Sequence, residues 1–193
     1  MHTIPRKLLS ALVFGAMATS ALALTAEEHK AEKQRIEATY KDANKACSSM
    51  SGNAKDVCQK QAKGQEKISE AELKAKQDPS PRNQAAVGKA RADADYDVAK
   101  EKCDDLKGNP KDVCVKDAKA AHVKALEAAK VSEAKMEPGQ NPQAHAANVA
   151  EARKDASQET REAQYKAAKE RCDAMSGDTK DKCVADAKRV YGQ

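Results

Sequence analysis

The chain has 193 residues, a formal net charge of +5, 34% charged residues and a mean hydropathy of −0.84. It contains one Phe and no Trp, which excludes a large aromatic core and the stacking platforms of many nucleic-acid-binding proteins. Low hydrophobic content is typical of disordered chains, but the abundant Ala, Lys and Glu are strong helix formers and favour long helices with thin cores.

Residues 1–23 have the pattern of a secretory signal peptide. Arg6 and Lys7 form a basic start, residues 8–22 are an apolar run, and an A-x-A cleavage signal ends at Ala23. The apolar run is too short to anchor the chain in a membrane, and no stop-transfer pattern follows it. We therefore predict cleavage near Ala23, export, and no transmembrane segment after cleavage. Loss of Arg6 and Lys7 leaves 33 of the 35 basic residues against 30 acidic ones, with both signs interspersed, so no nucleic-acid partner is expected.

The rest of the chain contains one unit three times, at 40–63, 96–119 and 165–188. Each unit starts with Tyr, which is followed by a Cys, a Gly, a Lys-Asp pair, a second Cys and a closing Ala-Lys. All six cysteines lie in these units as C-x10-C pairs: Cys47 and Cys58, Cys103 and Cys114, and Cys172 and Cys183. In an exported protein this spacing favours a structural disulfide within each unit, although six cysteines allow many other connectivities.

Each unit is predicted to fold into an αα-hairpin. Gly supplies the left-handed residue after one helix, and Asn or Asp is a favoured N-cap for the next. The glycines are Gly52, Gly108 and Gly177, and they are followed by Asn53, Asn109 and Asp178. Apolar residues recur every three or four positions, which places the Tyr and the first Cys in a seam between the helices. The seam is predicted to end in Met50, Leu106 and Met175. Each Cys then lies about one turn from the loop, where a bridge stabilises the hairpin by roughly 2–3 kcal/mol.

Proline-containing stretches at 78–81 and 137–142 divide the chain after the signal peptide. We predict an all-α fold of three disulfide-clasped αα-hairpins with long Ala/Lys/Glu-rich helices, joined by Pro-containing linkers. The predicted parts are the signal peptide at 1–23 and hairpin repeats at 24–78, 79–137 and 138–193. The predicted helices are 26–50, 54–77, 83–106, 110–136, 143–175 and 179–190. Apolar residues outside the seams are sparse, which favours loosely jointed hairpins over one compact bundle.

No catalytic, cofactor-binding or metal-binding residue is predicted. The C-x10-C spacing differs from the redox C-x-x-C motif, and the histidines are too scattered to complete a zinc site. The histidines after residue 23 are His29, His122 and His145, and we expect them to be exposed. The tyrosines offer either a ligand surface or seam packing, and their position favours packing. The repeated Lys-Asp pair is either a site or, more simply, a helix-capping Asp beside a solvated Lys. No nucleophile–base pairing, phosphate-binding loop or H-E-x-x-H motif occurs, so we predict that the protein is not an enzyme.

The signal peptide and the repeated Y-x6-C-x4-G-x5-C unit resemble a group of small exported proteins of Gram-negative bacteria. The resemblance rests on C-D-D-L-K-G-N-P-K-D-V-C at 103–114 and its two partner segments, and it covers most of the chain after residue 23. Such sequences are often labelled TolA-like cell-envelope proteins, although this chain has a cleavable signal in place of an evident anchor. The resemblance implies a periplasmic location.

The leading functional hypothesis is a non-enzymatic periplasmic helical repeat protein with a structural, cell-envelope-associated or stress-related role. Its partner would be an unknown protein or another component of the envelope. The alternative is a periplasmic chaperone-like binding module whose arms cover apolar segments of unfolded clients, although few apolar residues are expected to be exposed. A thiol oxidoreductase would require labile thiols of low pKa.

Overall fold

The computed structural model describes residues 24–193, which form six α-helices and no strand. The helices are α1 (Ala26–Ala46), α2 (Gly52–Gln77), α3 (Pro81–Lys102), α4 (Asn109–Met136), α5 (Pro142–Cys172) and α6 (Gly177–Tyr191). Short 3₁₀ turns, Cys47–Ser49 and Cys103–Asp105, follow α1 and α3. The all-α fold of disulfide-clasped hairpins is confirmed, whereas the predicted signal peptide at 1–23 lies outside the described residues.

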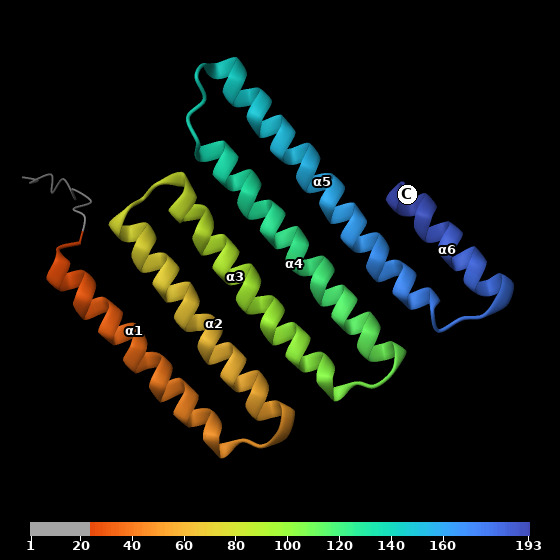
Figure 1. Ribbon diagram of the computed structural model, residues 1–193, viewed down its shortest axis with the longest axis horizontal. Coiled ribbons are helices and arrows are strands. Elements are labelled where there is room, and N and C mark those ends of the chain that lie inside the picture. The colour runs from red at the N-terminus through yellow and green to blue at the C-terminus, as the bar shows by residue number, and fades with distance from the viewer. Residues whose placement is uncertain (1–23) are drawn as a thin grey trace, which may run out of the picture.

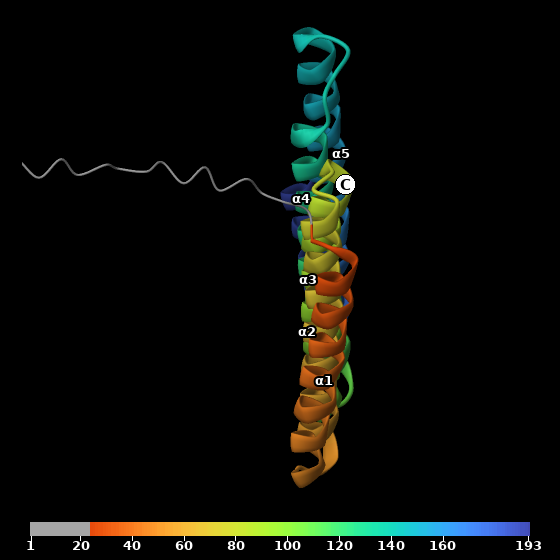
Figure 2. The same ribbon diagram turned by 90° about the vertical axis from the view of Figure 1, so that its left-hand side faces the viewer.

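The helices lie side by side in one flat antiparallel layer (Figures 1 and 2). Each helix packs mainly against the helix before it and the helix after it in the chain. The cysteine-containing loops lie along one edge of the layer, and the proline-containing turns lie along the opposite edge (Figure 1). The expectation of loosely jointed hairpins is wrong, because α2 packs along α3 and α4 packs along α5. The hairpins therefore form one continuous array.

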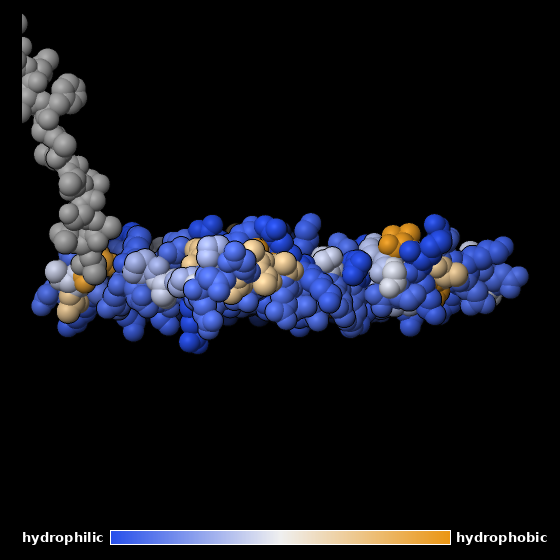
Figure 3. Space-filling model, turned by 90° about the horizontal axis from the view of Figure 1, so that it is seen from above, coloured by the Kyte–Doolittle hydropathy of each residue, from blue (hydrophilic) through white to orange (hydrophobic). Residues whose placement is uncertain are grey.

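Small side chains make this close packing possible. The buried apolar residues are Ile36, Cys47, Ala62, Leu73, Ala85, Ala92, Ala94, Cys103, Ala118, Ala120, Ala129, Val149, Ala167, Cys172 and Ala187. Gly64 of α2 faces Ala94 of α3 so closely that an added Cβ would lie 2.7 Å from the Ala94 Cβ. Close contact between backbones thus takes the place of large interlocking side chains, and the edge of the layer is predominantly hydrophilic (Figure 3).

Polar side chains define where the helices outside the cysteine loops begin. Thr25 and Glu28 form a capping box at α1, in which the Glu28 backbone N–H donates to Thr25 Oγ1 at 3.2 Å. At α5 the Ala144 N–H donates to Asn141 Oδ1 at 2.8 Å, and Pro142 occupies the first turn. These contacts satisfy N–H groups that have no partner within the helix, so the turn residues fix the helix boundaries.

Ion pairs flank the seams between neighbouring helices. The pairs that join α2, α3 and α4 are Lys60–Glu101 at 3.8 Å, Lys67–Asp97 at 3.8 Å, Arg91–Glu72 at 2.6 Å and Lys89–Glu133 at 3.0 Å. Each is at least partly exposed and stabilises the fold by at most about 1 kcal/mol. Their positions on both sides of α3 favour one register of its neighbours over others.

Candidate functional site: the disulfide-clasped tips

Each cysteine loop is closed by the disulfide that the sequence predicts. The pairs are Cys47–Cys58, Cys103–Cys114 and Cys172–Cys183, with Cα–Cα distances of 5.6, 5.7 and 5.7 Å. The first cysteine of each pair is completely buried. We call these three loops, with their disulfides, the tips.

The backbone of each tip turns sharply just after the first cysteine. In the second tip the Leu106 N–H donates to the Cys103 carbonyl at 3.0 Å, which closes a 3₁₀ turn, and the other tips contain the equivalent bond. Gly108 follows with φ 60° and ψ −150°, a region open essentially to glycine alone. The α-helix therefore stops at the cysteine and does not continue to the end of the apolar pattern.

This early stop exposes one large apolar residue on each tip. Met50, Leu106 and Met175 retain 47%, 41% and 42% of their accessible surface. The prediction that they close the buried seam is wrong, because the 3₁₀ turn carries them away from the partner helix. We call these three residues the apolar row. The tips that carry them lie along one edge of the layer (Figure 1), and neighbouring tips are two helix widths, or roughly 16–20 Å, apart.

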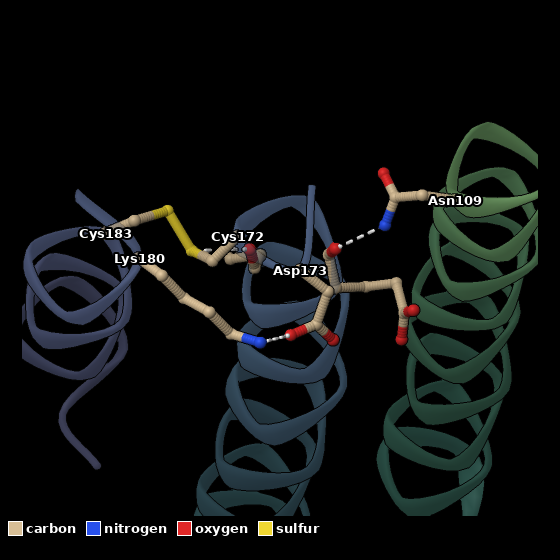
Figure 4. The surroundings of a disulfide bond; sticks show 7 residues. Asn109, Cys172, Asp173, Lys180 and Cys183 are labelled. Atoms are coloured by element: carbon tan, nitrogen blue, oxygen red, sulfur yellow. Dashed lines mark hydrogen bonds and ion pairs between the residues drawn. A yellow bond between two sulfur atoms is a disulfide. The ribbon is translucent and has the colours of Figure 1, made fainter. Parts of the chain in front are cut away.

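An ion pair crosses the second and third tips. Lys111 Nζ lies 2.9 Å from Asp104 Oδ1, and Lys180 Nζ lies 2.8 Å from Asp173 Oδ1 (Figure 4). The hydrogen bond from each lysine lowers the pKa of the aspartate carboxyl and raises the pKa of the lysine. In these two tips the lysine side chain remains partly exposed to solvent, as expected, but it is also paired with an aspartate. The first tip has Ser48 at the acidic position.

The predicted N-caps in the tips are also wrong. The N-cap positions of α2, α4 and α6 are Ser51, Gly108 and Ser176. At none of these three positions does a side chain accept a hydrogen bond from a backbone N–H of the helix. In the second tip, the residue after the glycine makes a contact between hairpins instead. Asn109 Nδ2 donates to the Glu170 carbonyl of α5 at 3.1 Å (Figure 4). Nearby, Arg171 of α5 pairs with Asp117 of α4, so polar contacts join the second tip to the third hairpin.

The repeated tyrosines are half-buried in the seams, as predicted, and two of them contact the closing lysine of their unit. Lys63 Nζ lies 5.0 Å from the centroid of the Tyr40 ring, and Lys119 Nζ lies 5.3 Å from that of Tyr96. In the first two units, the Tyr at the start and the Lys at the end therefore meet in a cation–π contact.

His29, His122 and His145 are each half-buried, so the expectation that they are exposed is wrong. His122 lies on α4 and faces α3. Its ring stacks on the Tyr96 ring with a centroid distance of 4.6 Å, and its Nε2 lies 2.6 Å from Asp93 Oδ1. This contact links α3 to α4 within the second hairpin. An Asp–His pair is able to move a proton, but no serine, threonine or cysteine nucleophile takes part in the contacts of this cluster.

The cysteines of the tips are all bridged, and each tip carries one exposed apolar side chain. In residues 24–193 every cysteine is in a disulfide, and no group of three or more His, Cys, Asp or Glu residues is placed to hold a metal ion. Among the same residues, no helix combines the length and apolar character needed to cross a membrane. What the tips present is an exposed apolar side chain on a backbone held by a disulfide.

Comparison with protein-family models, with curated proteins and with solved structures found no match. The resemblance to Cys-repeat cell-envelope proteins therefore stays a prediction, and the function must be argued from the geometry of this chain.

Proposed function

We propose that this protein is a non-enzymatic helical repeat scaffold of the periplasm that engages a component of the cell envelope through its tips. The observation that carries the proposal is the apolar row: Met50, Leu106 and Met175 are exposed, each on one of the three tips, and the tips lie along one edge of the layer. The disulfides favour an oxidising compartment, and the predicted signal peptide and the family resemblance favour the periplasm. Among residues 24–193, no cluster of titratable side chains with a neighbouring nucleophile argues for catalysis.

The tips have the properties of a preorganised binding surface. An apolar side chain loses little backbone entropy on binding when its loop is already held by a disulfide. A single Met or Leu contributes only modest affinity when it is buried by a partner. Three linked contacts on one rigid edge act together at high effective concentration, provided that the partner spans them.

Val190 makes a matched control for this proposal. It is 64% exposed on α6 and lies outside the tips. We compare a Met50→Ser, Leu106→Ser, Met175→Ser triple variant with Val190→Ser, each expressed with its signal peptide and captured in oxidised form from the periplasm. We expect the triple variant to lose its co-purifying envelope component and Val190→Ser to retain it. Equal recovery from both variants would contradict a role for the tips.

A chaperone-like binding module is the second candidate, and the identity of the tip residues favours it. Two members of the apolar row are Met, whose unbranched side chain adapts to irregular apolar surfaces. The scarcity of other exposed apolar side chains is an argument against it. We expect a chaperone to suppress the aggregation of a reduced model client, and the triple variant to lose that suppression. If the wild-type protein leaves aggregation unchanged, this second candidate is wrong.

A further inference from the structure

Over residues 151–162 of α5, acidic and basic residues lie on different sides of the helix. One stripe recurs every three or four residues and is acidic: Glu151, Asp155, Glu159 and Glu162. Arg153 lies about 160° around the helix from Asp155, because successive residues are about 100° apart. Lys154 and Arg161 lie between these two sides, on the edge of α5 that points away from α4. Positive and negative residues are interspersed in this part of the sequence, but the helix places them on different sides.

Contacts between α4 and α5 show which broad face of the layer each stripe occupies. A groove between the two helices opens beside Lys119, Val123 and Glu162, so the acidic stripe lies on this face. The Asp117–Arg171 pair joins the same helices on the opposite face, since Asp117 lies about 160° around α4 from Lys119. Arg153 shares that opposite face with Arg171.

Five cations gather on this opposite face and its adjoining edge. They are Lys124 and Lys135 of α4 and Arg153, Lys154 and Arg161 of α5, and we call them the basic face. All five are exposed, and none forms an ion pair or hydrogen bond with another residue in the described part of the chain. The exposed residues between them are short: Ala121, Ala125, Ala128, Ala146, Ala150 and Ser157. The acidic side chain on this face, Asp117, is already paired with Arg171.

The arrangement of the helices concentrates these charges and leaves them accessible. The Asp117–Arg171 pair sets the antiparallel register, which brings Lys124 near the level of Arg161 and Lys135 near Arg153. The five side chains therefore emerge from a patch of roughly 15 Å by 10 Å. α6 has 15 residues against 31 in α5, so it does not cover the half of α5 that carries Lys154 (Figure 1).

We propose that the basic face binds a flat anionic surface of phosphate-bearing lipid headgroups. Attraction to an anionic leaflet falls off within a Debye length, about 8 Å at physiological salt, so only cations that approach the surface together contribute fully. The layer is flat (Figure 2), which allows all five to do so. A single-stranded nucleic acid would instead favour a groove with stacking aromatics, and the basic face has neither. The basic face is separate from the apolar row, so this inference does not rest on the proposed function.

The test is co-sedimentation of the full oxidised protein with phosphatidylcholine vesicles, prepared with and without phosphatidylglycerol. We expect binding only with phosphatidylglycerol, and its loss at high salt. The variant is Lys124→Gln, Lys135→Gln, Arg153→Gln, Lys154→Gln and Arg161→Gln. The control removes five other exposed lysines that form no ion pair among the described residues: Lys30→Gln, Lys33→Gln, Lys41→Gln, Lys45→Gln and Lys74→Gln. Each cation at an anionic leaflet strengthens binding roughly fivefold, so we expect the first variant to bind at least about a hundredfold more weakly and the control to bind nearly as well as wild type.

Three results overturn the proposal: no binding to anionic vesicles, equal weakening of both variants, or tighter binding to single-stranded DNA than to vesicles at equal phosphate concentration. Circular dichroism checks that both variants remain helical. A second measurement uses only the wild-type protein, so it does not depend on the folding of any variant. Bound vesicles should protect Lys124, Lys135 and Lys154 from an amine-reactive reagent and leave Lys30 and Lys33 reactive, and the reverse pattern also overturns the proposal.

Discussion

Two asparagines at equivalent places in the repeat have different surroundings. Asn109 donates to the Glu170 carbonyl of the next hairpin, whereas Asn53 has both side-chain amide atoms buried without a partner. In the third unit the residue is Asp178, which is exposed because no hairpin follows it within the described residues. A buried polar group without a partner costs about 1–3 kcal/mol, so the same residue type stabilises one junction and weakens the other.

Replacing each asparagine with alanine should separate these effects. We expect Asn109→Ala to lower the free energy of unfolding by about 1 kcal/mol, because it removes a hydrogen bond between hairpins. Asn53→Ala should leave stability unchanged or raise it, because it removes an unpaired amide. Urea denaturation of the oxidised protein measures both, with Asp178→Ala as the exposed control. An equal loss in both asparagine variants would show that Asn53 has a partner in solution.

The ion pairs in the tips should make a contribution to stability that depends on pH. The hydrogen bond from Lys180 lowers the pKa of the Asp173 carboxyl, so the pair's contribution is present above the ordinary carboxyl pKa and is lost as the pH falls through the lowered value. We expect Lys180→Met to raise the Asp173 pKa toward its ordinary value, as followed by NMR titration. Lys55→Met is the control, because the first tip has Ser48 at the acidic position. An unchanged Asp173 pKa in Lys180→Met would contradict the pairing.

At the scale of the element, the helices differ in how many neighbours hold them. Helices α3 and α4 each pack on both sides, whereas α1 and α6 each have one neighbouring helix. α6 has 15 residues, a length at which isolated helices are marginal in water. Its place in the layer therefore depends on α5 and on the Cys172–Cys183 disulfide.

Removing one disulfide at a time should reveal this difference. In Cys172→Ser, Cys183→Ser we expect the backbone amides of α6 to lose protection from hydrogen exchange while α2, α3 and α4 keep theirs. In Cys103→Ser, Cys114→Ser the free energy of unfolding should fall by roughly 2–3 kcal/mol without local loss in α3 or α4, because neighbours hold both helices. Hydrogen exchange with mass spectrometry locates the loss. Full protection of α6 in the first variant would show that α5 holds it unaided.

The sequence predicted the helices, turns and disulfides better than it predicted which residues are exposed and how the hairpins pack together. Cysteine spacing and proline positions are local signals, and they placed the disulfides and the turns correctly. The apolar row was missed because the helical spacing of apolar residues continues through Met50 and its equivalents, while the backbone changes to a 3₁₀ turn. The single layer was missed because its contacts are made by small residues on two sides of a helix. α3 sets Ala94 against Gly64 of α2 and Gly88 against Ala129 of α4, and such residues give no strong apolar pattern.

At the scale of the molecule, the layer is a nearly one-dimensional array. Helices contact their neighbours in the chain and leave both broad faces to solvent, so stability should be close to a sum over hairpins and their junctions. The side of α6 that faces away from α5 differs from the equivalent side of α4. Ala120 is buried in α4, but its equivalent in α6 is Arg189, and Lys182 replaces Val113. Charged residues thus stand on α6 where the internal helix has small or apolar ones, which is typical of a terminal repeat.

A chain shortened to residues 24–136 tests both parts of this description. If junctions are local, the first two hairpins should keep the helicity per residue of the full protein, as measured by circular dichroism. Removing α5 uncovers the face of α4 on which Ala120 lies between Lys116 and Val123, so the fragment should self-associate in analytical ultracentrifugation. Ala120→Arg with Val113→Lys in the fragment should restore the monomer, because it copies the outer face of α6. A fragment that loses its helicity would show that all three hairpins fold as one cooperative unit, and a monomeric fragment without these substitutions would show that α4 needs no covering.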